Sequence, residues 1–422
     1  MRLSHVAWNL GGLSLPLGVA ALTVPSLIAT LGHERFGLLA LAWGLIGYAG
    51  AMDLGLGRAL TQMVARFRGE RKLSAIPDVL MTAGRLTLGT GLVGGALIAL
   101  IALAGGYKWI RVADTSPHEI LISMILLAVA LPAQAMSATY RGLNEAFLNF
   151  RGVSIVRATL GVVNFGGPYV VSLFTTQLPW LVASLVVSRL MALFVYRWLA
   201  LRCLQAEPET RGHAGYSRNV ARSLFAFGRW VTVSSIISPM LVQADRFVIA
   251  STVSAAAVSA YVLPYEVVVQ SLILVGAVSS VMFPGLSKIM QEAPDQWRAY
   301  FDKWLRRVMG LMLVVCLALA ALLPVVLPLW IGSSLNAESI AVGQVLCLGV
   351  FANAIGAMFY ALLHAKGRAD VTAKLHALEL PAFLAVLLPL VAEMGILGAA
   401  WAWVGRMAVD ALALALLAKR IK

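Results

Sequence analysis

Long runs of apolar residues alternate with short polar gaps along the whole chain of 422 residues. Each run is about twenty residues long, the length that an α-helix needs to cross a ~30 Å hydrocarbon core. The pattern therefore predicts an all-α polytopic membrane protein with about twelve transmembrane helices. They cover residues 8–31, 36–56, 86–106, 119–140, 153–175, 179–200, 228–251, 256–282, 308–330, 340–363, 375–392 and 396–418.

The longest polar break in the middle of the chain, at residues 207–222, follows the sixth predicted span. It predicts an N-terminal six-helix lobe at 1–206, a cytoplasmic linker at 207–222 and a C-terminal six-helix lobe at 223–422. Both lobes start on the same side of the membrane. Any repeat between them would therefore be parallel, related by an axis along the membrane normal.

Composition agrees with this interpretation and fixes an orientation. The chain is 60% hydrophobic and 12% charged, far from the balance of a soluble domain. Its net charge of +14 would suggest nucleic acid in a soluble protein. Here 27 of the 33 Lys and Arg residues fall in the termini and alternate loops, and three fall in the other loops. The positive-inside rule then predicts a multi-pass protein with both termini cytoplasmic and no nucleic-acid partner.

Enzyme chemistry has no support in the sequence. The six histidines show no metal-ligand spacing, no phosphate-cradling GxxxxGK[ST] loop is present, and no outer loop is long enough for a polymerase or ligase site. The N-terminal apolar run is too long for a removable signal peptide. Cys203, Cys316 and Cys347 indicate no disulfide framework. We expect no enzyme, no metal and no cofactor.

Three arginines remain, and they lie inside predicted spans: Arg189, Arg246 and Arg406. An arginine at the centre of a membrane helix costs about 2.5–3.5 kcal/mol on insertion scales. Each must therefore face a wet cavity, pair with an acid, or both. These three are the predicted substrate-binding residues, with Arg246 first and Arg189 second.

Acidic residues within or beside the spans are candidates for ion coupling or charge pairing: Asp245, Glu266 and Asp410. Arg406 and Asp410 have i,i+4 spacing and are expected to neutralise each other. Asp245 and Arg246 differ by about 100° of helix rotation, so Glu266 of the next helix is the better partner for Arg246.

A further acid, Asp53, ends the second predicted span and precedes Gly55, Gly57 and Arg58. The glycines allow a tight turn that a short carboxylate can cap. We therefore expect Asp53 and Arg58 to form a turn at the inner face of the membrane.

Several short motifs, in this order and spacing, resemble the Wzx-type lipid-linked oligosaccharide flippases of the multidrug/oligosaccharidyl-lipid/polysaccharide (MOP) exporter superfamily. The resemblance covers the whole chain, although after about residue 308 it rests on hydropathy alone. The motifs are Asn9 to Pro25, Leu31 to Gly37, Met52 to Arg58, Tyr140 to Asn144, Asp245 to Ile249, Ala260-Tyr261 with Pro264-Tyr265, and Phe283 to Ser287.

The resemblance implies a flippase that moves undecaprenyl-pyrophosphate-linked oligosaccharide from the cytoplasmic to the outer leaflet by alternating access, for O-antigen, capsule or exopolysaccharide assembly. It implies two six-helix bundles around a central cationic cavity, in the bacterial inner membrane. The partners expected are the lipid-linked pyrophosphate, membrane lipids and polysaccharide polymerase machinery. Membrane potential, H⁺ or Na⁺ would drive export.

Rival functions stay open at this point. A cation-coupled multidrug exporter of the same superfamily has the same architecture, but cationic drugs prefer an acidic cavity. A major-facilitator transporter also has twelve spans, yet its inner-loop motif is not met by residues 53–72. From another class, a polytopic glycan polymerase or ligase requires a large outer loop.

Overall fold

The regular elements of the described residues are α-helices and short 3-10 turns, without a strand among them. The computed structural model describes residues 3–49, 53, 55–210, 215–293, 295–366 and 368–420. Met52 and Leu54 of the predicted motif and residues 211–214 of the predicted linker lie outside this set. Because the described elements are helical, the predicted all-α polytopic architecture is confirmed.

The twelve predicted spans correspond to helices of the structure. Two of them form α1 (Leu3–Ala49), which changes direction at Gly32. Five follow as α3 (Ile76–Leu103), α4 (Pro117–Ala146), α5 (Phe150–Ser172), α6 (Leu178–Gln205) and α7 (Arg218–Thr252). The eighth is divided into α8 (Ala255–Val269) and α9 (Leu272–Glu292). The last four are α10 (Trp297–Ile331), α11 (Glu338–Ala365) and the two halves of α12 (Ala369–Arg420).

Eight helical segments of the described residues are both long and apolar enough to cross a membrane. Two of these, in α1 and α12, contain a kink and account for two predicted spans each. The predicted spans that do not meet this measure are α5 and α7.

Glycine explains both kinks. The backbone at Gly32 has φ 73° and ψ 169°, and the backbone at Gly395 has φ 59° and ψ −135°. Residues with a Cβ rarely adopt these conformations, whereas glycine adopts them at little cost. Each glycine therefore ends one span and starts the next without an intervening loop.

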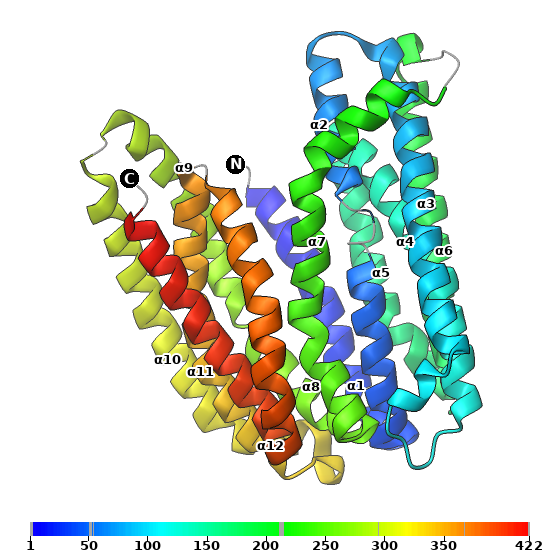
Figure 1. The fold of residues 1–422 in the computed structure, drawn as a ribbon, viewed down its shortest axis with the longest axis vertical. Helices are drawn as coiled ribbons and strands as arrows, with labels where there is room; N and C mark the ends of the chain where they lie inside the picture. The colour runs from blue at the N-terminus through cyan, green and yellow to red at the C-terminus, as the bar shows by residue number, and fades with distance from the viewer. Residues whose placement is uncertain are drawn as a thin grey trace. The chain divides into compact units, whose positions relative to one another are not determined.

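The chain divides into two compact units, Met1–Pro239 and Met240–Lys422, called unit 1 and unit 2 below. In unit 1, α4 packs against α3 and α6, and α5 packs against α1 and α6 (Figure 1). In unit 2, α11 packs against α8, α9, α10 and α12. The division lies within α7, and the lobe boundary at 207–222 stays a prediction.

One helix of unit 1 was not anticipated as a separate element. The helix α2 (Leu56–Gly69) carries Arg66 and Arg68 in its last turn and buries Leu56, Leu60 and Val64 on its other face. This two-sided pattern is typical of a helix that lies in the membrane interface rather than across the membrane. In the structure it packs against α4.

Candidate functional site

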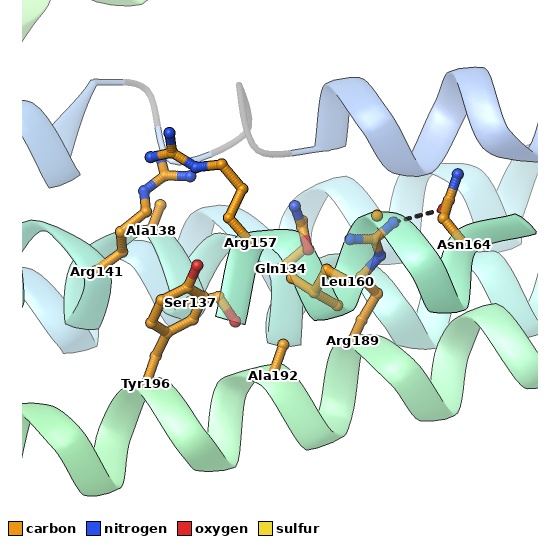
Figure 2. Close-up of a pocket in the computed structure, with 11 residues that line it drawn as sticks. Gln134, Ser137, Ala138, Arg141, Arg157, Leu160, Asn164, Arg189, Ala192 and Tyr196 are labelled. Carbon is orange, nitrogen blue, oxygen red and sulfur yellow. Dashed lines mark hydrogen bonds between the residues drawn. The ribbon is translucent and has the colours of Figure 1, made fainter. Parts of the chain in front are cut away.

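A cavity of 330 Å³ lies within unit 1, between α4, α5 and α6 (Figure 2). Its polar lining consists of three arginines, two amides and two hydroxyl groups: Arg141, Arg157, Arg189, Gln134, Asn164, Ser137 and Tyr196. Within the described part of the chain, no acidic side chain lines it. The cavity therefore concentrates positive charge in a helix bundle.

Arg189 of α6 is the most deeply placed of the three arginines. Its Nη2 donates a hydrogen bond of 2.8 Å to Oδ1 of Asn164 on α5. Its Nε is buried and has no hydrogen-bond partner among the described residues. No described carboxylate lies within 4.0 Å of its guanidinium, so its charge is held by a neutral amide alone.

Neighbouring helices bind the backbones of α5 and α6 beside Arg189. Nε1 of Trp43 on α1 donates to the backbone carbonyl of Asn164 at 2.9 Å. Nδ2 of Asn144 on α4 donates to the backbone carbonyl of Tyr196 at 3.1 Å. The first bond ties α5 to α1 and the second ties α6 to α4, so the helices that carry Asn164 and Arg189 are each anchored to a neighbouring helix of unit 1.

Arg141 and Arg157 supply the remaining charge of the cavity. Nε of Arg141 and Nη2 of Arg157 lie 3.8 and 3.9 Å from the same oxygen, Oε1 of Glu145. Their side chains are 44% and 60% exposed. One carboxylate at these distances balances at most one of the two arginines, so the site keeps a net positive charge with Arg189 included.

Arg246 of α7 has a different environment, in unit 2. Its Nη2 lies 2.8 Å from Oε1 of Glu266 on α8. The pairing of these two residues that the sequence predicts is thereby confirmed. The guanidinium also lies 5.1 Å from the ring centroid of Tyr265. The side chain is 7% exposed and that of Glu266 is 50% exposed. Arg246 is thus already bound by a carboxylate.

Asp245 is buried beside Arg246 and does not form an ion pair with its side chain. Oδ2 of Asp245 accepts a hydrogen bond of 2.7 Å from the hydroxyl of Tyr261 on α8. Oδ1 accepts one of 2.8 Å from the backbone N–H of Arg246. Asp245 therefore ties α7 to α8.

Arg406 departs from the sequence-based expectation. Its Nε lies 3.8 Å from Oε2 of Glu379 in the first half of α12, and its Nη1 donates to the carbonyl of Leu241 at 2.9 Å. Asp410 lies instead beside His376, at 3.8 Å. Arg406 and Asp410 both lie in the second half of α12, but the kink at Gly395 brings Glu379 of the first half within reach of Arg406.

Asp53 closes the turn before α2. Its Oδ1 and Oδ2 accept hydrogen bonds from the backbone N–H groups of Gly55 at 2.9 Å and Gly57 at 3.1 Å. Gly55 has φ 73°, which favours glycine. Arg58 is exposed at this turn. Whether the turn faces the cytoplasm stays a prediction.

Several of these groups are not predicted by the sequence. Arg141 and Arg157 belong to the charges that predict the orientation, although Arg157 lies within the fifth predicted span. Asn164 gave no signal, because a single amide in a span is common. His376 and Glu379 have i,i+3 spacing, which places both on one helical face and is a usable signal.

The geometry is that of a helical membrane protein with a basic cavity, and the family comparison agrees. A model of the family described as "Polysaccharide biosynthesis protein" matches residues 3–290. The chain belongs to this family. The resemblance to Wzx-type flippases of the MOP superfamily that the motifs indicated is thereby confirmed.

Two curated relatives are similar to this chain over most of their length. A "Putative O-antigen transporter" of Shigella flexneri is 28% identical over 98% of this chain and 96% of that protein. "Lipopolysaccharide biosynthesis protein WzxC" of Escherichia coli K12 is 24% identical over 88% of this chain and 71% of that protein. The relatives support a transporter rather than an enzyme.

Solved structures share the fold. An inward-facing multidrug resistance transporter of the MATE family, in the MOP superfamily, matches with a TM-score of 0.77 at 14% identity, over 97% of each chain. A MOP superfamily transporter from Pyrococcus furiosus, whose binding pocket is described as reversed in polarity, matches with a TM-score of 0.62 at 15% identity, over 97% of this chain and 92% of that one. These similarities establish the fold of this chain.

Proposed function

We propose that this protein is a flippase that carries undecaprenyl-pyrophosphate-linked oligosaccharide from the cytoplasmic to the outer leaflet of the bacterial inner membrane, by alternating access. The product would serve O-antigen, capsule or exopolysaccharide assembly. Membership of the polysaccharide biosynthesis family supports this, as does the similarity to an O-antigen transporter over nearly the full length of both chains.

The observation that carries the proposal is the charge of the cavity at Arg189. A pyrophosphate diester carries a negative charge on each phosphate and cannot enter hydrocarbon bare. Arg189 has a neutral hydrogen-bond partner, and Arg141 and Arg157 share one carboxylate. The planar fork of arginine binds phosphate oxygens in pairs, and it does so best when no acid competes.

We therefore propose a different order of binding residues from the one that the sequence predicts. The sequence predicts Arg246 as the first binding residue, but its guanidinium already pairs with the carboxylate of Glu266 at 2.8 Å. Arg406 is held by Glu379 and by a backbone carbonyl. We therefore assign substrate binding to Arg189, with Arg141 and Arg157, and assign Arg246 and Arg406 to charge pairing within unit 2.

The membrane potential supplies a driving force for this direction of transport. A single charge that crosses the membrane gains about 2.3 kcal/mol per 100 mV. The bacterial cytoplasm is electrically negative, so export of an anionic headgroup is favoured. The same charge argument disfavours a multidrug exporter of cations, because the cavity repels them.

Location and partners follow from the same proposal. Both termini are placed in the cytoplasm because the charged loops on that side hold most of the Lys and Arg residues. The lipid tail stays in the bilayer during transfer, and polysaccharide polymerase machinery at the outer face receives the product.

Replacement of Arg189 tests the proposal. Arg189→Gln keeps a polar side chain and removes the charge, and Arg197→Gln on the exposed face of α6 is the matched control. The purified proteins are titrated with inorganic pyrophosphate by calorimetry. Loss of charge-assisted hydrogen bonds worth about 1.5–3 kcal/mol weakens binding by roughly 10- to 100-fold.

Export is measured in cells of the source strain that lack the native protein. We expect Arg189→Gln to abolish surface polysaccharide, with the lipid-linked precursor accumulating inside and the protein present at the wild-type level. Arg197→Gln should export normally. Normal export by Arg189→Gln at wild-type levels would show that the cavity does not bind the substrate.

A further inference from the structure

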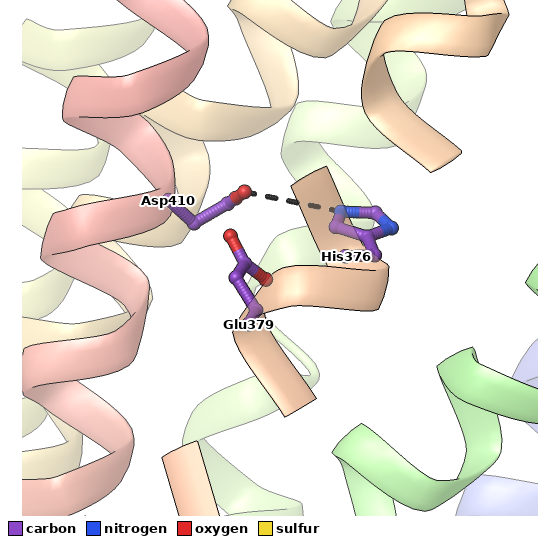
Figure 3. A group of neighbouring side chains, drawn as sticks. All are labelled: His376, Glu379 and Asp410. Atoms are coloured by element: carbon purple, nitrogen blue, oxygen red, sulfur yellow. Dashed lines mark ion pairs between the residues drawn. The ribbon is translucent and has the colours of Figure 1, made fainter. Parts of the chain in front are cut away.

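Unit 2 contains a group of three titratable side chains that the cavity of unit 1 does not use. His376 and Glu379 lie in the first half of α12 and Asp410 lies in the second half. One ligand atom from each lies within 4.8 Å of the others, and Figure 3 shows the three side chains converging. The kink at Gly395 brings them together from the two halves.

The two carboxyl groups face each other without a donor between them. Glu379 is 7% exposed, and neither of its carboxylate oxygens has a hydrogen-bond partner among the described residues. Oδ1 of Asp410 likewise lacks one. Ionised carboxylates only accept hydrogen bonds, and two of them this close disfavour each other's charge. The arrangement therefore requires a bound cation or a proton.

With both carboxyl groups ionised and His376 neutral, the group of side chains carries one net negative charge. Arg406 lies 3.8 Å from Glu379 and balances one carboxylate. His376 lies 3.8 Å from Asp410. Tyr360 of α11 stacks with both His376 and His364. His364 thus supplies a second imidazole ring near the site. One proton, on the carboxyl pair or on His376, makes the group neutral.

A proton fits this site better than a metal ion does. The guanidinium of Arg406 already lies beside Glu379 and repels a second cation there. A proton shared between Glu379 and Asp410 instead gives the pair the donor that it lacks. Two carboxyl groups that share one proton are an established solution for acids at such short spacing.

The position of His376 suggests the route by which the proton arrives. It lies seven residues into α12, about 10 Å from the start of the helix. Its side chain is 27% exposed, more than that of Asp410 at 14%. In the predicted orientation this end of the helix faces the cytoplasm. Histidine is the side chain that most readily exchanges protons near neutral pH.

We propose that Glu379 and Asp410 form a proton-binding site that exchanges with the cytoplasm through His376, and that this proton is coupled to export. The coupling rests on the proposed flippase function, whereas the proton site does not. Protonation removes the charge of one carboxylate and weakens the attraction of the pair for Arg406. The packing of the two halves of α12 against each other would thereby depend on whether the site holds the proton.

Infrared spectroscopy of the purified protein tests the proton site directly. We expect a protonated carboxylic acid band at neutral pH that shifts in D₂O, and its loss in both Glu379→Gln and Asp410→Asn. The control Glu393→Gln, an exposed carboxyl on the same helix, should keep the band. Absence of the band in wild type, its persistence in both variants, or its loss when sodium replaces potassium at constant pH would overturn the proposal.

Transport in proteoliposomes tests the coupling. Vesicles that contain lipid-linked precursor from the source strain are given a pH gradient of either direction. Wild type should change its rate when the gradient is reversed, and Glu379→Gln should export at the same rate in both. An equal response of Glu379→Gln and wild type would refute the coupling. Absence of export by wild type in every gradient would refute the flippase function itself and the coupling with it, while the infrared result would still decide the proton site.

Discussion

The hydrogen bond between Tyr261 and Asp245 should stabilise unit 2, and Tyr261→Phe removes it with the loss of a single oxygen atom. Both side chains are buried, at 0% and 1% exposure, and the donor–acceptor distance is 2.7 Å. The substitution leaves Oδ2 of Asp245 without a donor in an apolar environment. No solvent can replace the lost hydroxyl there.

The expected cost follows from the charge of the acceptor. Hydrogen bonds to charged groups contribute about 1.5–3 kcal/mol in soluble proteins. Interhelical hydrogen bonds measured in a membrane protein average about 0.6 kcal/mol, with a maximum of about 1.7 kcal/mol. A buried, charged acceptor belongs at the upper end of the membrane range, so we expect about 1–2 kcal/mol. For a unit of this size that corresponds to a lower Tm by roughly 2–8 °C.

Thermal unfolding in detergent, with a double-mutant cycle, is the assay. Tyr261→Phe is measured alone and in the Asp245→Asn background, where the acceptor is neutral and the substitution should cost less than about 1 kcal/mol. Tyr216→Phe, at an exposed tyrosine of unit 1, is the control for the change of residue type. An equal cost in the two backgrounds, or a Tm for Tyr261→Phe within about 1 °C of wild type, would refute the reasoning.

Two further predictions concern the turn and the helix contact around α2. Asp53→Ala removes the acceptor of two buried N–H groups, at Gly55 and Gly57, so it should cost about 1–3 kcal/mol and lower the Tm of the detergent-solubilised protein; an unchanged Tm would show that the turn forms without its cap. Gly142→Ala places a Cβ 2.6 Å from the backbone carbonyl oxygen of Gly57 and should cost about 1–3 kcal/mol, whereas Gly84→Ala meets no atom within 4 Å and should not destabilise. Equal Tm values for the two alanine variants would contradict the close approach of α2 and α4.

Much of the fold could be predicted from hydropathy alone. The gaps between predicted spans at 31–36 and 392–396 fall on the kinks at Gly32 and Gly395. Two features were missed for physical reasons. The helix α2 is amphipathic and too short to cross a membrane, so a search for apolar runs passes over it. The break between α8 and α9 falls at Gln270 and Ser271, and two polar residues inside a long apolar run are too few to separate two spans by hydropathy.

The candidate site could be predicted only in part. The cost of burying a charge identified Arg189, Arg246 and Arg406, because that cost is a property of the residue type and its depth. Their partners depend on which helices approach each other. The amide of Asn164 and the carboxylate of Glu379 reach their arginines through tertiary packing that no local spacing describes.

The kind of partner is what separates the three membrane arginines. A guanidinium held by a carboxylate satisfies its charge within the protein, and an incoming phosphate would have to displace an acid that is already in place. A guanidinium held by an amide keeps most of its charge for a ligand. By this criterion we assign Arg246 and Arg406, which lie beside Glu266 and Glu379, to charge pairing in unit 2, and we propose Arg189, with Asn164, as the anion-binding residue of unit 1.

The same criterion divides the proposed tasks between the two units. Unit 1 contains excess positive charge at its cavity, as an anion carrier requires. Unit 2 contains excess negative charge at Glu379 and Asp410, as a proton carrier requires. An excess of each sign inside a membrane protein is costly unless a ligand neutralises it for part of the transport cycle. Each excess is therefore better explained by a mobile partner, a phosphate in one unit and a proton in the other, than by the fold alone.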